Sequence, residues 1–287
     1  MRGYLENVLL PVVFAGFSLL YAAVWFCAVR LHTVHARAAA AALLIGALFC
    51  FANAPLQAPD EHAHFLRAFA LSQGDFTYRY DYDYPDDVRH LTAVFPAKFY
   101  SDIQSAGKDS VAGAIGRYIA APGDADAPAV STSVQLLLPY VFPALGMALA
   151  RLFGANALYC LYAGRLMNVL AYAACVFFAV RMAARRRGPL LLAALLPMTL
   201  YMAASLSYDS MFFGAVVLFL GFMLKDGFSR RDLLLSAIVF GVIAMIKPIY
   251  LPLALLYLGI PKQQLRLRAP RPVGLLLLLA AGGVFAG

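Results

Sequence analysis

The chain has 287 residues, of which 63% are hydrophobic and only 13% are charged, and its formal net charge is +8. A chain this apolar, with several apolar runs of about 20 residues, is typical of a multi-pass helical membrane protein and not of a soluble domain. The positive charge lies in short clusters between apolar runs and not on one folded domain, which excludes a nucleic-acid-binding protein.

The basic clusters orient the predicted membrane spans. They are Arg30 and Arg37; Arg181, Arg185, Arg186 and Arg187; Lys225, Arg230 and Arg231; and Lys262, Arg266, Arg268 and Arg271. Short basic segments of this kind stay on the cytoplasmic side of a membrane. Residues 53–133, in contrast, carry 11 acidic and 6 basic side chains. We therefore expect this region to be an extracytoplasmic loop.

The sequence predicts an all-α polytopic fold in three parts. Residues 1–54 hold two N-terminal membrane helices, residues 55–157 form the acidic extracytoplasmic loop with juxtamembrane helices, and residues 158–287 form a transmembrane bundle of about five spans. In chain order the spans are expected at residues 8–29, 38–54, 158–180, 189–206, 210–224, 233–246 and 249–260.

Two apolar runs do not fit as ordinary spans. Residues 134–150 are assigned to a juxtamembrane or re-entrant helix, because a crossing there would place the cluster at Arg181–Arg187 outside. Residues 273–287 are shorter than the roughly 20 that a straight helix needs to cross a bilayer. We expect either a short last span or a chain that continues.

A charged segment follows the second predicted span directly, and ionisable groups at a bilayer edge indicate a reaction site. Pro59 and the two acids after it favour the start of a helix, and Gly74 favours its end, so a helix is predicted over residues 59–73. Asp60, His64 and Arg67 would share one face of that helix. The alternative is a surface helix with an ordinary ion pair.

The same segment contains candidate metal ligands in Asp60, Glu61, His62 and His64. Consecutive residues on a helix point apart, and no two of these histidines lie four residues apart as in helical zinc motifs. A divalent cation is therefore kept as a possible cofactor, and no metal site is predicted.

Tyrosines alternate with polar residues in the segment 76–87. They could stack on sugar rings, or the segment could be a strand whose tyrosines pack at the membrane interface. The strand is the favoured interpretation.

Further along the chain, Asp209 and Lys247 are predicted to lie on the same side of the membrane as Asp60. A carboxylate between two apolar spans is a candidate site residue, although Asp209 could also cap the following span. Arg165 and Asn168, near the outer half of the third expected span, are equally open to two interpretations, because an arginine so placed can simply extend to the interface.

Several motifs carry a family resemblance. They are Pro59-Asp60-Glu61 with His64 and Gly74; Arg165 with Asn168; Pro197-Met198; Ser205 to Asp209; and Lys247-Pro248 with Tyr250. In this order they resemble a bacterial domain-of-unknown-function family of multi-pass membrane proteins, related to the GT-C glycosyltransferases. The resemblance implies a GT-C-like helical bundle in the bacterial inner membrane, with its catalytic residues in the first extracytoplasmic loop.

The resemblance also implies a reaction. GT-C enzymes transfer a sugar from a polyprenyl-phosphate carrier to an acceptor, here an envelope glycan or lipid, and an acidic residue of the first outer loop acts as base. Asp60 matches that position, with Glu61 as the alternate. The predicted lipid-phosphate contacts are Lys247, Arg165, His64 and Arg67, and the predicted substrate contacts are Asp209, Asn168 and Tyr250.

Two other classes of function remain open. A transporter or lipid flippase would also have several spans and intramembrane charges, but it is expected to show an internal repeat, and none is seen. A non-catalytic assembly partner of a cell-envelope polysaccharide system is the second alternative.

Overall fold

The computed structural model describes residues 29–77, 82–97, 110–123, 126–183 and 186–260, together with residues 18, 22 and 25. The described part is helical and contains no strand. Its elements are α3 (Val34–Ala52), α4 (Glu61–Ser72), α5 (Asp86–Val94), α7 (Val111–Ala120), η2 (Leu138–Tyr140), α8 (Val141–Leu152), α9 (Ala157–Met182), α10 (Arg187–Ala194), α11 (Pro197–Ala203), α12 (Asp209–Met223), α13 (Arg230–Ile246) and η3 (Pro248–Gly259).

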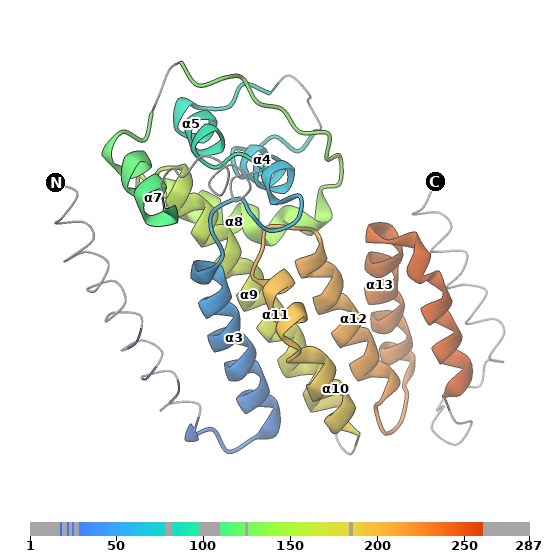
Figure 1. Cartoon of the computed structure of the whole chain (residues 1–287). Coiled ribbons are helices and arrows are strands. Elements are labelled where there is room, and N and C mark those ends of the chain that lie inside the picture. The colour runs from blue at the N-terminus through green and yellow to red at the C-terminus, as the bar shows by residue number, and fades with distance from the viewer. Residues whose placement is uncertain are drawn as a thin grey trace.

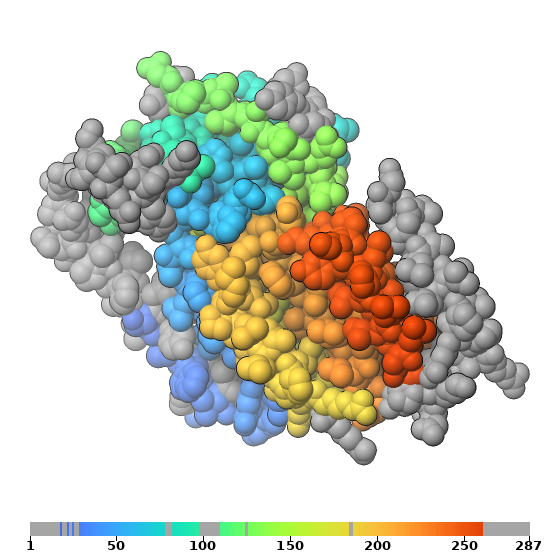
Figure 2. Space-filling model, turned by 45° about the vertical axis from the view of Figure 1, so that its right-hand side comes forward, coloured from blue at the N-terminus to red at the C-terminus, as the bar shows by residue number. Residues whose placement is uncertain are grey.

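The elements form two parts, a bundle and a cap (Figure 1). Helices α3 and α9 to α13, with η3, run side by side as the bundle, and α4, α5, α7 and α8 form the cap on one end of it. In the space-filling view the cap, cyan to green, sits on the end of the yellow to red helices (Figure 2). In sequence the cap lies between α3 and α9, which correspond to the second and third expected spans, so it is formed by residues of the acidic loop.

Two of the described helices, α3 and α9, are long and apolar enough to cross a membrane by length and composition. At 1.5 Å per residue, the 26 residues of α9 extend about 39 Å, beyond the roughly 30 Å of a bilayer's hydrocarbon core. Helix α9 packs against α3, α12 and α8 and so connects the bundle to the cap.

The other predicted spans correspond to shorter or broken helices. The span expected at residues 189–206 is divided into α10 and α11, because Pro197 lacks an N–H and begins a new helix at its first turn. Those at 210–224 and 233–246 correspond to α12 and α13. The one at 249–260 corresponds to η3, a 3₁₀ helix with Pro252 inside it. The expected spans at 8–29 and 273–287 lie outside the described residues, apart from residues 18, 22, 25 and 29.

The basic clusters of the described bundle lie at the end away from the cap. At that end Figure 1 shows the start of α3, the end of α9, the start of α10 and the turn between α12 and α13. These are the segments that contain the basic clusters around Arg37, Arg181, Arg187 and Lys225. The start of α12 and the end of α13, which carry Asp209 and Lys247, lie at the cap end. This is the segregation that the positive-inside rule produces.

Helix α4 is the centre of the cap and is buried along most of its length. It begins at Glu61, so Pro59 precedes the helix and is not in its first turn as the sequence predicted. Asp60 is the residue before the helix and has left-handed backbone angles, with φ of 55°. Gly74, with φ of 88°, follows the helix end as predicted, a conformation that glycine adopts without strain.

The tyrosine-rich segment is only partly described. Residues 78–81 lie outside the described part, and residues 82–85 form no strand. The two acids that follow, Asp86 and Asp87, begin α5. Asp87 accepts hydrogen bonds from the Ala157 backbone N–H (2.8 Å) and from Arg151 (3.1 Å), and so holds α5 on the junction of α8 and α9.

The run at residues 134–150 contains η2 and α8, and α8 packs on both α4 and α9. Gly146 permits the close approach of α8 to α9, because a Cβ atom there would lie 2.5 Å from the Ala163 carbonyl oxygen. The packing of cap on bundle therefore depends on a residue without a side chain.

Replacing Gly146 by Ala is expected to destabilise the fold by about 1–3 kcal/mol through overpacking. Thermal unfolding in detergent micelles measures the effect as a lower Tm. Gly241→Ala, at an α13 position where an added Cβ meets nothing within 4 Å, is the matched control. The control should gain up to about 1 kcal/mol from helix propensity. Equal Tm shifts in the two variants would contradict the packing described.

Candidate functional site

The junction of cap and bundle is held by a fully buried ion pair between Glu61 and Arg165, both 0% exposed. The Arg165 Nε donates to Glu61 Oε1 at 2.8 Å, and Nη2 donates to Oε2 at 2.5 Å. The other guanidinium N–H groups donate to the main-chain oxygens of Cys50 (2.7 Å), Asn53 (2.9 Å) and Ala54 (3.0 Å). All five donors of Arg165 are therefore used.

The Glu61 carboxylate is equally saturated. Besides the two bonds from Arg165, Oε1 accepts from the Leu206 backbone N–H at 3.0 Å and Oε2 from the Ala58 N–H at 3.3 Å. The pair thereby joins the end of α3, the start of α4, helix α9 and the loop before α12. The structure corrects two predictions from sequence: Glu61 has no free oxygen to act as a base, and Arg165 has no free donor for a phosphate.

Asp60 lies next to Glu61 in the chain but in a different environment. It is solvent-exposed, and its side chain does not cap α4. A left-handed conformation is uncommon for a residue other than glycine, and such residues cluster at functional sites. Of the two acids, Asp60 is exposed to solvent and Glu61 is buried.

His64 lies one turn further along α4 and is buried against aromatic rings. Its Nδ1 is 2.5 Å from the Tyr140 hydroxyl, and its ring packs edge-on to Tyr208 with centroids 4.8 Å apart. Burial lowers the pKa of His64, against the opposing effect of the carboxylates of Asp60, Asp209 and Glu61. Because its backbone N–H bonds the Asp60 carbonyl oxygen and its ring packs on Tyr208, His64 links the start of α4 to the segment before α12.

Asp209 and Lys247 form the bundle side of the site as a partly exposed ion pair. Their side chains are 17% and 29% exposed, and the ammonium lies 2.5 Å from Asp209 Oδ1, outside hydrogen-bond geometry. The ammonium also lies over the rings of Tyr208 (5.4 Å) and Phe212 (5.1 Å). Such aromatic faces attract a cation. Of the four side chains predicted to contact phosphate, Lys247 is the most exposed.

Two further predicted residues, Arg67 and Tyr250, differ in exposure: Arg67 is buried and Tyr250 is exposed. Arg67 is 2% exposed and donates to the main-chain oxygens of Leu136, Asp75 and Thr77. These bonds, made by Nε and Nη1, brace the cap, and the phosphate contact of Arg67 stays a prediction. Tyr250 is 40% exposed and packs on Phe212 at 4.7 Å, near Lys247.

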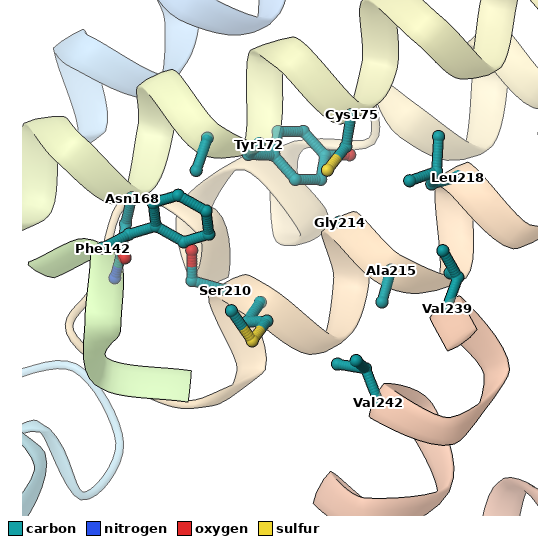
Figure 3. Close-up of a pocket in the computed structure, with 12 residues that line it drawn as sticks. Phe142, Asn168, Tyr172, Cys175, Ser210, Gly214, Ala215, Leu218, Val239 and Val242 are labelled. Atoms are coloured by element: carbon teal, nitrogen blue, oxygen red, sulfur yellow. The ribbon is translucent and has the colours of Figure 1, made fainter. Parts of the chain in front are cut away.

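Asn168 follows Arg165 by three residues on α9 and is buried. Its Nδ2 donates to the Ser205 carbonyl at 2.8 Å, and the residue lines a cavity of about 160 Å³ between α9, α12 and α13. In Figure 3, Asn168, Ser210 and Phe142 lie at one end of this cavity, and Val239 and Val242 lie at the other. The walls are almost entirely apolar, so the cavity suits a hydrocarbon better than a sugar.

Within the described residues, no group of three or more His, Cys, Asp or Glu side chains could hold a metal ion.

Two residues of the site were not predicted, Tyr140 and Tyr208. Tyr208 directly precedes Asp209 in a segment already singled out, and that adjacency was an available signal. Tyr140 lies within an apolar run and contacts His64 across 76 residues of sequence, which no local pattern reveals.

Comparison with protein families matches residues 43–286 to a model described as a predicted membrane protein, DUF2142. The chain belongs to this family. The match includes the second half of α3, the cap and the rest of the described bundle, so every residue of the site lies within it. The family description supports a membrane protein with helical, apolar segments. Comparison with curated proteins and with solved structures gives no significant match.

Replacing Glu61 by Gln should destabilise the protein by about 3–5 kcal/mol, because it leaves the Arg165 charge buried without its partner. Equilibrium unfolding in micelles measures this. Lys225→Met is the control, since it removes a partly exposed pair with Asp232 and should cost no more than about 1 kcal/mol. A double Glu61→Met, Arg165→Met variant should be more stable than Arg165→Met alone. Wild-type stability of Glu61→Gln would contradict the structural role.

The lowered pKa of His64 predicts a pH dependence of stability. Because burial holds the pKa of His64 below its ordinary value of 6.5, the unfolded chain binds more protons than the folded one below that pH. The free energy of unfolding should therefore fall as the pH drops below about 6.5, and His64→Gln should make this fall less steep. Burial also lowers the pKa of His62, so His62→Gln should remove a separate share. An unchanged slope in His64→Gln would contradict the assignment.

Proposed function

We propose that this protein is a membrane glycosyltransferase that transfers a sugar from a polyprenyl-phosphate carrier to an envelope glycan or lipid acceptor. It would act in the bacterial inner membrane. The bundle would span that membrane, and the cap would lie on the extracytoplasmic face. The observation that carries the proposal is a series of contacts at one end of the bundle. The His64 backbone N–H bonds the Asp60 carbonyl oxygen at 3.3 Å, the His64 ring packs on Tyr208, and the Lys247 ammonium lies over the Tyr208 ring. An exposed carboxylate and a partly exposed cation therefore lie at the same end of the bundle.

In the proposed reaction Asp60 acts as general base. Its carboxylate accepts the proton of an acceptor hydroxyl while that oxygen attacks the anomeric carbon of the donor sugar. The bond between the anomeric carbon and the phosphate oxygen breaks, and polyprenyl phosphate leaves with the bonding electrons. The configuration at the anomeric carbon is inverted, because the acceptor attacks opposite to the leaving group.

Lys247 is the proposed partner of the leaving phosphate, since a fixed cation stabilises the negative charge that develops there. Asp209 then serves as its counter-ion in the substrate-free protein, and the donor phosphate replaces that carboxylate. The released Asp209, with Tyr250, is proposed to contact the sugar or the acceptor. Asn168 is proposed to contact the donor at the apolar cavity that this residue lines.

The roles proposed for Asp60 and Lys247 predict different defects: loss of Asp60 should slow sugar transfer, and loss of Lys247 should weaken phosphate binding. In proteoliposomes supplied with radiolabelled polyprenyl-phosphate hexoses and pentoses, and with an envelope glycan and lipid extract as acceptor, Asp60→Asn should reduce the rate of sugar transfer from the carrier by about 10²–10⁴-fold. Its affinity for polyprenyl phosphate should not change. Lys247→Met should instead weaken polyprenyl phosphate binding by about 10- to 100-fold, the value of a hydrogen bond to a charged group.

The matched controls are Asp83→Asn, an exposed carboxylate of the cap, and Lys225→Met, at the opposite end of the bundle. Both should behave as wild type. Full sugar transfer by Asp60→Asn would remove Asp60 as the base. Binding of polyprenyl phosphate without sugar transfer from any donor in the wild type would favour the transporter alternative, and no binding at all would favour the assembly partner.

A further inference from the structure

Helix α8, with η2 before it, exposes a continuous stripe of large apolar side chains. The stripe consists of Leu138, Val141, Phe142, Leu145, Leu149, Leu152 and Phe153, which are between 39% and 90% exposed. Their spacing of three and four residues places them on one face. The opposite face, with Pro143, Gly146 and Met147, is buried on α4 and α9.

The stripe carries no charge. The one charged residue of α8, Arg151, turns inward to Asp87 at 3.1 Å and lies 4.7 Å from the Phe69 ring centroid. A helix that faced water over the same length would be expected to present charged or polar side chains on its outer face. Apolar patches of this extent mark a surface that another apolar phase covers.

The stripe is continuous with the surface of a membrane-crossing helix. Leu149 and Phe153 of the stripe line a shallow groove of about 320 Å³ together with Leu166 and Leu170 of α9. Both α9 residues are exposed, at 37% and 52%, and α9 has the length and composition of a span. The apolar surface that faces lipid on α9 therefore extends onto α8 without interruption.

The position of α8 fits the edge of a bilayer. It lies on the side of the cap that faces the bundle (Figure 1), at the end that carries the start of α9. Tyr140, which contacts His64, directly precedes α8, so the depth of α8 also sets the depth of the charged site.

We infer that α8 is an interfacial helix that lies in the bilayer edge on the cap side, with its stripe in the acyl chains. The lipid surface is its partner, and no protein is needed to cover it. The helix fixes the site at the depth of the lipid head groups, where a polar group carried on a membrane-anchored chain would meet Asp60 and Lys247. The inference does not depend on sugar transfer.

Single-tryptophan reporters in the full chain test the inference. The chain has one tryptophan, Trp25, so Trp25→Phe provides the background. Leu145→Trp and Phe153→Trp report on the stripe, Leu170→Trp reports on the middle of α9, and Phe76→Trp, at a position 69% exposed, reports on the cap. Each variant is placed in nanodiscs of phosphatidylcholine brominated at shallow or at deep acyl positions. Far-UV circular dichroism checks that each variant is folded.

We expect both stripe reporters to be quenched by bromine, more strongly by shallow than by deep labels. Leu170→Trp should show the reverse preference, and Phe76→Trp should remain unquenched. Unquenched, red-shifted emission from both stripe reporters would show that water covers the stripe and would overturn the inference. Unquenched, blue-shifted emission together with dimers in cross-linking would assign the surface to a second copy, and stronger quenching by deep labels would make α8 part of a crossing.

Discussion

The buried pair of Glu61 and Arg165 is the interaction on which the rest of the structure depends. Two charges removed from water are costly, and such a pair is tolerated only when every donor and acceptor is satisfied. Here five donors and the two carboxylate oxygens are all bonded, to side chains and backbone from four separate segments. The end of α3, the start of α4, helix α9 and the loop before α12 are therefore held at one level of the bundle.

The position of the candidate site follows from this constraint. Because Glu61 points into the pair as the first residue of α4, the chain enters the helix through Asp60 in a left-handed conformation, and Asp60 stays at the surface. The same pair bonds Leu206 and so holds the loop that leads to Tyr208 and Asp209. A structural ion pair thus supports a more exposed one, Asp209 with Lys247, whose cation is accessible to an anion.

The sequence was most informative where a pattern is local. Apolar runs and basic clusters predicted the helical bundle and its two unlike ends, and proline and glycine positions predicted most of one cap helix. The sequence ranked Asp60 before Glu61 but could not predict that Glu61 is buried in an ion pair, because its partner, Arg165, lies 104 positions away. Pro197 could have predicted the break between α10 and α11, but the apolar run at residues 189–206 is continuous and was interpreted as one span. Tyr140 could not be found, since its contact with His64 arises only when η2 and α8 pack on α4.

The account is tested most directly by an experimental structure of the full chain in lipid nanodiscs with polyprenyl phosphate bound. The quantities to measure are the distances from the phosphate to the Lys247 ammonium and to the Arg165 guanidinium. The account predicts the phosphate beside Lys247, with Asp209 displaced and every bond of the Glu61 and Arg165 pair kept. A phosphate bound to Arg165, with Glu61 released toward the substrate, would contradict it.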